Sequence, residues 1–334
     1  MNVLVSGAAG YIGSHAIRRV RSAGHAVVAL DDLSLGHREA LPEGVPFVEC
    51  DVGDRERVRA ALVEHRIDCV MHFAAYINVG ESVTEPLLYY RKNTTGTLGL
   101  LEAMQAAGVK RLVFSSTCAT YGEPASMPIH EEMPQTPINP YGWSKLFSER
   151  IMRDLCHAVP DFGCIALRYF NVAGSAEDGS IGEDHHPETH LIPVILQAMS
   201  GVRDKISIFG DDYATPDGTC VRDYVHVEDL ADAHVVAMER LRPGFAYYNV
   251  GIGHGHSVKE ILLAAEDVVG KKAPAVVVPR RPGDAPELYA DASKIERELG
   301  WRARRTDIRA TIKSAWTWFQ RRPHGYASAR GNEP

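Results

Sequence analysis

The chain has 334 residues, enough for one large domain or two ordinary ones with an ample core. Hydrophobic residues make up 45% of it and charged residues 24%, as in soluble globular proteins. The net charge of -7 argues against a nucleic-acid partner. No apolar run approaches the ~20 residues that span a bilayer, so we expect no membrane partner either.

The amino terminus and the cysteines favour a cytoplasmic protein. MNVLVSGAAGYIG has no basic region and no small-residue cleavage site, so we do not expect a signal peptide. The cysteines are scattered and contain no C-x-x-C pair, and we expect them to be reduced thiols. They are Cys50, Cys69, Cys118, Cys156, Cys164 and Cys220.

The first half of the chain alternates short β-branched runs with amphipathic stretches, beginning with a helix over 11–24. Strands alternating with helices indicate βαβ units and a buried parallel sheet, so we predict the α/β class. The strands are expected over 2–7, 26–32, 46–52, 68–75, 110–117 and 164–171.

The pattern loosens from about residue 172, where the Gly- and Asp-rich stretch SAEDGSIGEDHHPETH begins. We expect a smaller, discontinuous C-terminal α/β domain for the substrate from this point. The predicted division is a nucleotide-binding domain over 1–172 with later returns near 204–228 and 275–298, a substrate domain over 173–326 outside those returns, and a tail over 327–334 that is poorly ordered beyond Tyr326.

Three glycines stand three residues apart between the first strand and the first helix: Gly7, Gly10 and Gly13. Glycines there permit a tight turn and let a helix N-terminus approach a pyrophosphate. Asp31 ends the second strand, 18 residues after Gly13. A carboxylate at this place accepts hydrogen bonds from ribose hydroxyls and repels a 2′-phosphate. The pattern therefore predicts a Rossmann-type doubly wound sheet that binds NAD rather than NADP.

Tyr141 and Lys145 in NPYGWSKLFSE would share one face of a helix. A Tyr-x-x-x-Lys match alone is weak, because short patterns arise by chance. A phenol with a pKa near ~10 is a poor base at neutral pH, but a nearby ammonium and a positive nicotinamide ring favour the phenolate. The strand over 110–117 ends at Thr117, whose hydroxyl would reach the same cleft. The glycine loop, the strand-end hydroxyl and the Tyr/Lys pair occur in this order along the chain. Together they predict Thr117, Tyr141 and Lys145 as catalytic residues.

Over nearly its whole length the chain resembles the extended short-chain dehydrogenase/reductases, and within them the UDP-glucose 4-epimerases. The matching stretches include GAAGYIGSH, NTTGTLGLLEAM, SSTCATYGEP, PYGWSK, LRYFNVAG, THLIP, IFGDDYATPDGTCVRDYVHVEDLADAH, RRPGD and ADASK. The resemblance implies an enzyme that holds NAD and interconverts UDP-glucose and UDP-galactose through a 4-keto sugar. Tyr141 would take the proton of the sugar 4-hydroxyl, and Thr117 would hydrogen-bond the same oxygen.

The resemblance also implies two sets of binding residues. The cofactor set is Gly7, Gly10, Tyr11, Ile12, Gly13, Asp31, Asp32, Asp51, Val52, Phe73, Ala74, Ala75, Asn93, Thr117, Tyr141, Lys145 and Phe170. The substrate set is Thr117, Tyr141, Asn171, His190, Leu191, Ser207, Ile208, Phe209, Arg222, Arg281, Asp284 and Leu288. Arg222 and Arg281 would hold the diphosphate, Asp284 the uridine ribose and Phe209 the uracil.

Two positions depart from the family pattern or vary within it. Ile77 stands where some members carry a lysine near the cofactor, which puts one cofactor contact in doubt. Leu288 occupies a place where a small residue leaves room for an N-acetyl group on the sugar and a tyrosine closes that room. Leucine is intermediate in size, so we expect UDP-glucose and UDP-galactose to be preferred over the N-acetylated pair.

Histidines at 185, 186 and 190 raise the question of a metal site, but we predict none. Their spacing fits no standard zinc pattern, and we expect no cysteine or acid to complete a set. We instead expect a loop on the substrate side of the molecule.

Other activities on the same scaffold would require other residues. A dehydratase would need an Asp-Glu pair straight after Thr117, where Cys118 and Ala119 stand. A UDP-glucuronate 4-epimerase or decarboxylase stays open, as does an epimerase of N-acetylated UDP-sugars. A non-catalytic sensor would typically have lost the Tyr/Lys pair.

The family usually forms dimers through two helices of each subunit, here near 85–106 and 143–157, so a homodimer is implied. Their apolar residues could face a partner or their own sheet. These residues are Leu88, Leu98, Leu101, Met104, Leu146, Ile151 and Leu155.

Overall fold

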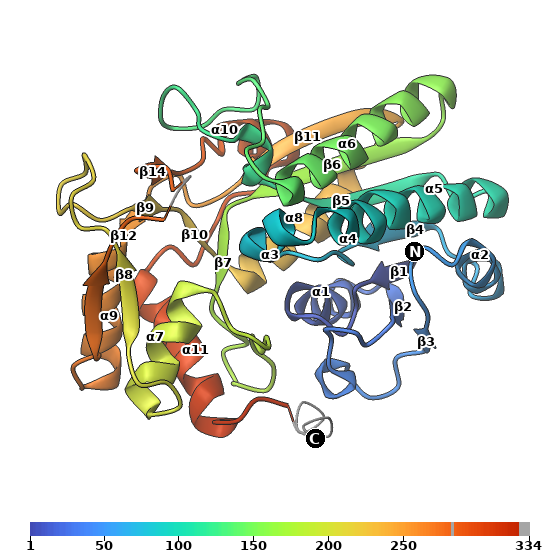
Figure 1. Ribbon diagram of the computed structural model, residues 1–334. Helices are drawn as coiled ribbons and strands as arrows, with labels where there is room; N and C mark the ends of the chain where they lie inside the picture. The colour runs from blue at the N-terminus through green and yellow to red at the C-terminus, as the bar shows by residue number, and fades with distance from the viewer. Residues whose placement is uncertain (282–283, 327–334) are drawn as a thin grey trace.

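The computed structural model describes residues 1–281 and 284–326; the predicted tail over 327–334 lies outside the described residues. Its centre is a seven-stranded sheet in the order β11-β6-β5-β4-β1-β2-β3, in which all neighbours are parallel (Figure 1). The strand order reverses between β1 and β4, and ligands of such sheets bind at the carboxyl ends beside this reversal. The strands are β1 (Asn2–Ser6), β2 (Ala26–Asp31), β3 (Phe47–Glu49), β4 (Cys69–His72), β5 (Arg111–Thr117), β6 (Gly163–Tyr169) and β11 (Gly244–Val250).

Helices cover both faces of this sheet, as the doubly wound prediction requires. One face packs against α1 (Tyr11–Ser22), α8 (Val227–Arg240) and α10 (Ser293–Leu299). The other packs against α2 (Arg55–Glu64), α5 (Gly96–Ala107) and α6 (Pro140–Ala158). The central strands are buried on both sides, which explains their nearly continuous apolar sequences. The predicted α/β class and Rossmann-type architecture are confirmed.

The six strands expected in the first half of the chain are all present, but the returning segments differ from the prediction. The chain returns to the large sheet through α8 and β11, within 227–250. The segments expected near 204–228 and 275–298 contribute β8 (Ile206–Phe209) and β13 (Ala275–Val278), which instead pair with each other in a separate two-stranded sheet. Within the described residues of the second segment, α10 lies against α8 and β11.

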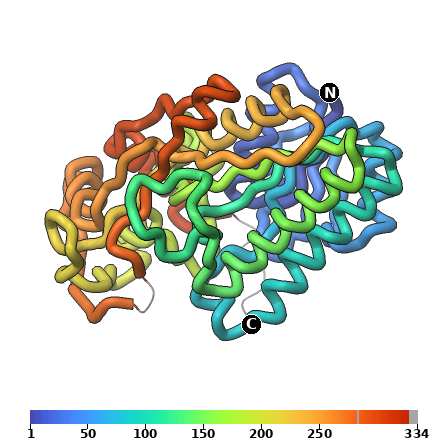
Figure 2. The backbone as a smooth tube through the Cα atoms, turned by 90° about the horizontal axis from the view of Figure 1, so that it is seen from above, coloured from blue at the N-terminus to red at the C-terminus, as the bar shows by residue number. Residues whose placement is uncertain are grey.

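The smaller C-terminal part has its own core. Helices α7 (Leu191–Ser200), α9 (Val258–Val269) and α11 (Ile308–Arg321) pack together at the lower left of Figure 1. Figure 2 shows the same two-part arrangement from above. Two short sheets complete the strands: β7 (Asn171–Ala173) with β10 (Tyr224–His226), and β12 (His256–Ser257), β9 (Val221–Arg222) and β14 (Glu287–Leu288). The remaining short elements are η1 (Arg38–Ala40), α3 (Val79–Thr84), α4 (Pro86–Tyr89), η2 (Tyr90–Thr95) and η3 (Cys118–Tyr121).

The two helices that are expected to form a dimer interface bury part of their apolar surface within the subunit. Leu101 and Met104 are fully buried in the core against the sheet, and Ile151 and Leu155 pack at its border. Leu98 remains exposed. Among the described residues, none of the helices combines the length and apolar character that crossing a bilayer requires.

Candidate active site

The glycine loop between β1 and α1 is shaped by contacts that exclude side chains. Gly7 has a φ of +71°, and a Cβ placed there would lie 2.4 Å from the backbone nitrogen of Ala74. A Cβ at Gly13 would lie 2.0 Å from the carbonyl oxygen of Gly7. Gly10 is the N-cap of α1, and the first turn of that helix carries no acidic residue. The positive end of the helix is therefore left open to an anion, which fits the pyrophosphate of a dinucleotide.

Asp31 is held beside this loop at the end of β2. Its Oδ2 accepts the N–H of Ala9 at 2.9 Å, and its Oδ1 accepts the N–H of Leu33 at 2.8 Å. Burial raises the pKa of the carboxyl, and these two hydrogen bonds oppose the rise. The two hydrogen bonds thus fix the side chain at the edge of the loop. Its contact with the ribose of the cofactor stays a prediction.

Lys92 links two acids of the expected cofactor groove, and the sequence reasoning missed it. Its Nζ lies 2.7 Å from Oδ2 of Asp51 and 3.6 Å from Oδ2 of Asp32. The hydrogen bond from Lys92 lowers the pKa of Asp51 despite its partial burial. A half-exposed lysine one residue before Asn93 gave no local signal that it would bridge two distant acids.

Asn93 fastens the loop after β4 to α6. Its Oδ1 accepts the N–H of Tyr76 at 2.8 Å, and its Nδ2 donates to Tyr76 O at 2.9 Å. The same Nδ2 donates to Ser144 Oγ at 3.0 Å. This buried amide therefore positions the loop that carries Phe73, Ala74 and Ala75 against the helix of the Tyr/Lys pair.

The structure brings Thr117, Tyr141 and Lys145 together at the carboxyl edge of the sheet. Asn139 caps α6 by accepting the N–H of Gly142 at 2.8 Å, so Tyr141 and Lys145 lie in the first two turns of that helix. The Tyr141 side chain lies beside that of Thr117, which ends β5. All three side chains are buried.

Lys145 points toward the ends of the central strands. Its Nζ donates to the carbonyl oxygen of Ser115 at 2.9 Å and lies 4.9 Å from the centre of the Phe114 ring. Burial lowers its pKa to about 7, and Glu149, one turn later, opposes this. A lysine with such a pKa exchanges its proton near neutral pH, as acid–base chemistry requires.

The protein residues around Tyr141 do not by themselves favour its phenolate. Burial raises the pKa of its phenol far above the usual value, and the hydrogen bond with Thr117 opposes this only in part. A phenolate in a low-dielectric site is costly, and the neighbouring Tyr169 raises the pKa further. The protein's own residues thus keep Tyr141 protonated, and the phenolate needs a further positive charge beside it.

His72, at the end of β4, is a buried support that the sequence reasoning did not single out. Its Nδ1 lies 2.8 Å from Ser6 Oγ and its Nε2 lies 2.9 Å from Thr97 Oγ1. Burial, together with Lys145, lowers its pKa to about 3. The neutral ring therefore ties the ends of β1 and β4 to α5 without adding a charge.

On the opposite side of the site, Asp284 lies between two arginines. Its Oδ2 is 2.9 Å from Nε of Arg281, and its Oδ1 is 3.7 Å from Nη2 of Arg222. The Arg281 guanidinium lies over the ring of Phe209, 4.5 Å from its centre. Four residues predicted to bind the nucleotide are therefore neighbours, although they come from distant parts of the chain.

The other predicted substrate residues lie on elements around this group. Leu288 pairs in register with Arg222 and packs in a cluster that contains Phe170 and Cys118. The backbone N–H of Asn171 donates to the carbonyl oxygen of Asp223 at 3.0 Å. His190 and Leu191 begin α7. On β8, Ser207 is exposed and Ile208 is buried, so a substrate contact of Ile208 would have to come from its backbone.

The expectation that no acid completes a set with the histidines is wrong. Glu183 and Glu188 converge with His185 and His190, so that one possible ligand atom of each lies within 4.8 Å of the others. His186 is outside this group. The two acids are close in sequence to the histidines, but their spacing alone does not show that the four side chains converge.

Comparison with known proteins agrees with this geometry. The model of the NAD dependent epimerase/dehydratase family matches residues 3–251. The chain belongs to this family. It is 51% identical over 332 residues to the UDP-glucose 4-epimerase of Streptococcus mutans, covering 98% of this chain and 99% of the relative. The resemblance drawn from the sequence motifs is thereby confirmed.

Two solved structures of the family are also similar over almost the whole chain. The UDP-glucose 4-epimerase from Stenotrophomonas maltophila, with bound NAD and formylated UDP-arabinopyranose, superposes with a TM-score of 0.94 at 42% identity, covering 97% of this chain and 99% of that one. The enzyme from Bifidobacterium longum, in complex with NAD⁺ and UDP, has a TM-score of 0.94 at 40% identity, covering 98% and 100%. The likeness therefore includes the smaller C-terminal part as well as the large sheet.

Proposed function

We propose that this protein is an NAD-dependent UDP-glucose 4-epimerase, which interconverts UDP-glucose and UDP-galactose through a transient 4-keto sugar. The observation that carries this is the convergence of Thr117, Tyr141 and Lys145 beside the glycine loop. The neighbouring group of Arg222, Arg281 and Asp284 supplies the cations that a nucleotide diphosphate needs on a chain with net charge -7. NAD fits the loop, because Gly10 is the N-cap of α1 and the first turn of that helix contains no acidic residue.

The residues of the site divide the proton chemistry between them. NAD, when bound, supplies the acceptor and donor of the sugar C4 hydride, and its positive ring favours a phenolate nearby. Tyr141 takes the proton from the 4-hydroxyl and returns it after C4 has been reduced on the opposite face. Thr117, whose side chain lies beside that of Tyr141, holds the same sugar oxygen. Lys145 helps to offset the charge of the phenolate and donates to the cofactor ribose.

Inversion at C4 also requires that the sugar turn over while the nucleotide stays bound. Arg222 and Arg281 grip the diphosphate, Asp284 accepts from the uridine ribose, and Phe209 lies against the uracil. The exposed ring of Phe209 beneath the Arg281 guanidinium supports this assignment. Strong contacts are thus concentrated on the nucleotide, and the hexose is left free to rotate about the diphosphate.

We further propose that the protein works as a homodimer in the cytoplasm. Large apolar side chains are exposed on neighbouring helices α3 to α6: Val83, Leu87, Leu98, Trp143 and Phe147. A Leu87→Asp and Phe147→Asp double variant should sediment as a monomer, whereas Leu263→Asp, at an exposed leucine on α9, should not change the mass. The six cysteines are free thiols, which supports a reducing compartment.

The activity is tested with purified protein, UDP-galactose and no added NAD, following UDP-glucose by proton NMR. We expect interconversion that Tyr141→Phe lowers by about 10²- to 10⁴-fold, the usual contribution of a general acid–base. Tyr89→Phe is the matched control, because its ring lies 6.5 Å from that of Tyr141 and its hydroxyl hydrogen-bonds Glu81 instead. The proposal fails if folded protein converts no UDP-galactose even with NAD supplied; UDP-glucuronate and UDP-GlcNAc would then be tried.

A further inference from the structure

Four side chains of the segment between β7 and α7 converge away from the catalytic trio. Glu183, His185, Glu188 and His190 lie within eight residues of chain, spaced as E-x-H-x-x-E-x-H. One nitrogen or oxygen of each lies within 4.8 Å of the other three. We call this group the His–Glu cluster. It forms part of no step in the proposed reaction.

The distances within the His–Glu cluster are those of neighbouring ligands around one ion. Glu183 Oε1 lies 2.8 Å from Nδ1 of His190 and 3.3 Å from Nδ1 of His185. Glu188 lies 3.2 Å from His190 through Oε1 and 3.6 Å from His185 through Oε2. Ligand atoms 2.0 to 2.2 Å from a tetrahedral zinc ion are separated by about 3.3 to 3.6 Å. The four His–Glu separations, from 2.8 to 3.6 Å, lie near this range.

Nδ1 of His185 has no hydrogen-bond partner. It is enclosed by protein, and although it faces the carboxylates of Glu183 and Glu188, it makes hydrogen-bonding geometry with neither. Its contacts with the two carboxylates are therefore ion pairs rather than well-formed hydrogen bonds. A cation between the two carboxylates would accept its lone pair.

The carboxylates are already oriented for such an ion. The side chains of Glu183 and Glu188 are 5% and 2% exposed, so each needs an opposite charge close by. Glu188 Oε1 accepts the N–H groups of Thr189 at 2.7 Å and His190 at 2.8 Å, which leaves Oε2 toward His185. Hydrogen bonds of this kind hold metal-binding carboxylates in place.

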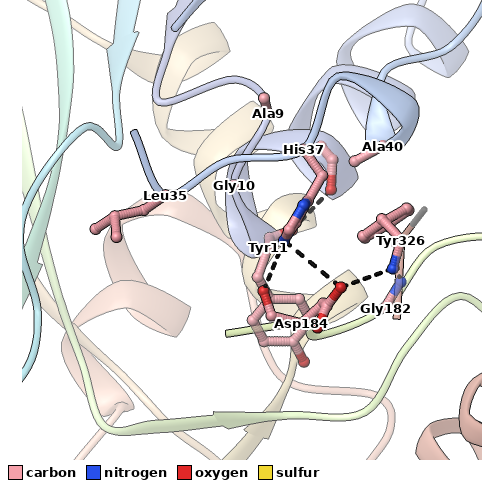
Figure 3. A pocket seen from close by; sticks show the side chains of 10 residues that line it. Ala9, Gly10, Tyr11, Leu35, His37, Ala40, Gly182, Asp184 and Tyr326 are labelled. Carbon is pink, nitrogen blue, oxygen red and sulfur yellow. Dashed lines mark hydrogen bonds and ion pairs between the residues drawn. The ribbon is translucent and has the colours of Figure 1, made fainter. Parts of the chain in front are cut away.

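The backbone of the segment is anchored from outside. Trp318 Nε1 donates to the carbonyl oxygen of Glu183 at 3.1 Å, and Arg203 Nη2 donates to that of Glu188 at 3.1 Å. Asp184 lies between Glu183 and Glu188 in sequence. Figure 3 shows that it is hydrogen-bonded to His37 and Tyr326 in the small pocket beside the start of α1. The donor atoms are thus presented by a loop that is tied to both parts of the molecule.

We propose that Glu183, His185, Glu188 and His190 form a structural site for one divalent transition-metal ion of the zinc class. Two carboxylates cancel the charge of the ion, and imidazole is a preferred ligand of such metals. All four positions are filled by protein, as in structural rather than catalytic sites. The ion would clip together a loop that ends at His190, where α7 begins, and whose His185 ring lies 6.4 Å from that of Tyr11.

Without a metal, protons can neutralise the same four groups. Burial opposes protonation, but the two carboxylates outweigh it and raise the pKa of His185 to about 9 and that of His190 to about 10. The cluster would then be two ion pairs. Metal binding must displace these protons, so the two states are distinguished by metal content and by ligand chemistry.

The test uses full-length protein stripped with a chelator and then titrated calorimetrically with Zn²⁺ alone. We expect one tightly bound zinc per chain and a thermal midpoint that rises with zinc, because a ligand of the folded state stabilises it. His185→Ala should bind zinc at least about 100-fold more weakly. His186→Ala is the matched control, since it removes the adjacent histidine from outside the cluster and should bind as the wild type does.

Wild-type protein also gives a readout that does not depend on a variant folding. X-ray absorption at the zinc edge should show a shell of four nitrogen and oxygen ligands that includes two imidazoles, and Co²⁺ in place of zinc should give the intense visible spectrum of a tetrahedral site. The proposal is overturned if the wild type takes up no stoichiometric zinc. It is equally overturned if His185→Ala and His186→Ala bind zinc alike, or if the absorption spectrum lacks imidazole.

Discussion

Glu149 and Arg168 form a buried ion pair beneath the catalytic edge of the sheet. Arg168 Nη2 lies 2.6 Å from Glu149 Oε2, and Arg168 Nε donates to Glu149 Oε1 at 3.0 Å, with side chains only 1% and 2% exposed. Glu149 stands one turn after Lys145 on α6, and it also accepts a hydrogen bond from Ser116, next to Thr117. The pair therefore joins the helix that carries the tyrosine and lysine to the ends of β5 and β6.

Replacing Glu149 by glutamine should destabilise the protein strongly. The substitution keeps the shape but leaves the Arg168 guanidinium buried without its counter-charge, which typically costs about 3 to 5 kcal/mol. Urea unfolding of Glu149→Gln measures this loss. Glu102→Gln is the control, because Glu102 is exposed and lies 3.6 Å from Arg55, so its loss should stay below about 1 kcal/mol. Equal effects of the two changes would contradict the importance of the buried pair.

The pKa of Lys145 predicts a pH-dependent contribution to stability. Burial lowers it to about 7 from a usual 10.5, so above pH 7 the unfolded chain holds a proton that the folded protein has released. Because the unfolded state then binds more protons, wild-type stability rises with pH through this window relative to Lys145→Met. The difference in unfolding free energy should change by about 2 to 3 kcal/mol between pH 6 and 9. Parallel urea titrations of the two proteins would refute this if the difference stayed constant.

The proposed contact of Arg281 with the diphosphate predicts that Arg281 and its neighbour Arg280 affect substrate binding differently. Arg281→Ala should raise KM for UDP-galactose by about 10- to 100-fold with little change in kcat, since a charge-assisted hydrogen bond is worth about 1.5 to 3 kcal/mol. Calorimetry with UDP should show the same weakening. Arg280 is the matched control, because its guanidinium lies over Tyr213 and its Nε is 2.7 Å from Asp212. A similar KM effect in Arg280→Ala would remove the assignment of Arg281 to the diphosphate.

The order of local signals along the chain was enough to predict six of the seven strands of the large sheet and to predict Thr117, Tyr141 and Lys145 as a group at its edge. Each βα unit carries its own signal: a β-branched run, a turn and an apolar helix face, as in the stretch from Val3 to Asp31. Thr117, Tyr141 and Lys145 follow from this, because the carboxyl ends of parallel strands meet at one edge. The strand over 244–250 was missed, since nothing local in GFAYYNV shows which sheet it will join.

Energies that depend on burial could not be predicted from residue spacing. The sequence pairs Tyr141 with a lysine, but only the structure shows that burial raises the pKa of the phenol. The His–Glu cluster was overlooked for a related reason. Its segment has no regular secondary structure, so no helical or strand period indicates which side chains converge. Lys92 likewise reaches Asp51 only because η2 passes beside the loop after β3.

The size and position of Leu288 lead to a prediction of the specificity of the enzyme among UDP-sugars. It is half-buried on β14 and packs in the cluster of Phe170 and Cys118, beside the end of β5. Its size should limit the room for an N-acetyl group at the sugar C2, so UDP-glucose should be turned over faster than UDP-GlcNAc. Leu288→Tyr should lower the ratio of kcat/KM for UDP-GlcNAc to that for UDP-glucose by about tenfold or more, and Leu288→Ala should raise it. Equal turnover of both sugars by the wild type, or an equal loss for both in Leu288→Tyr, would show that Leu288 does not set this specificity.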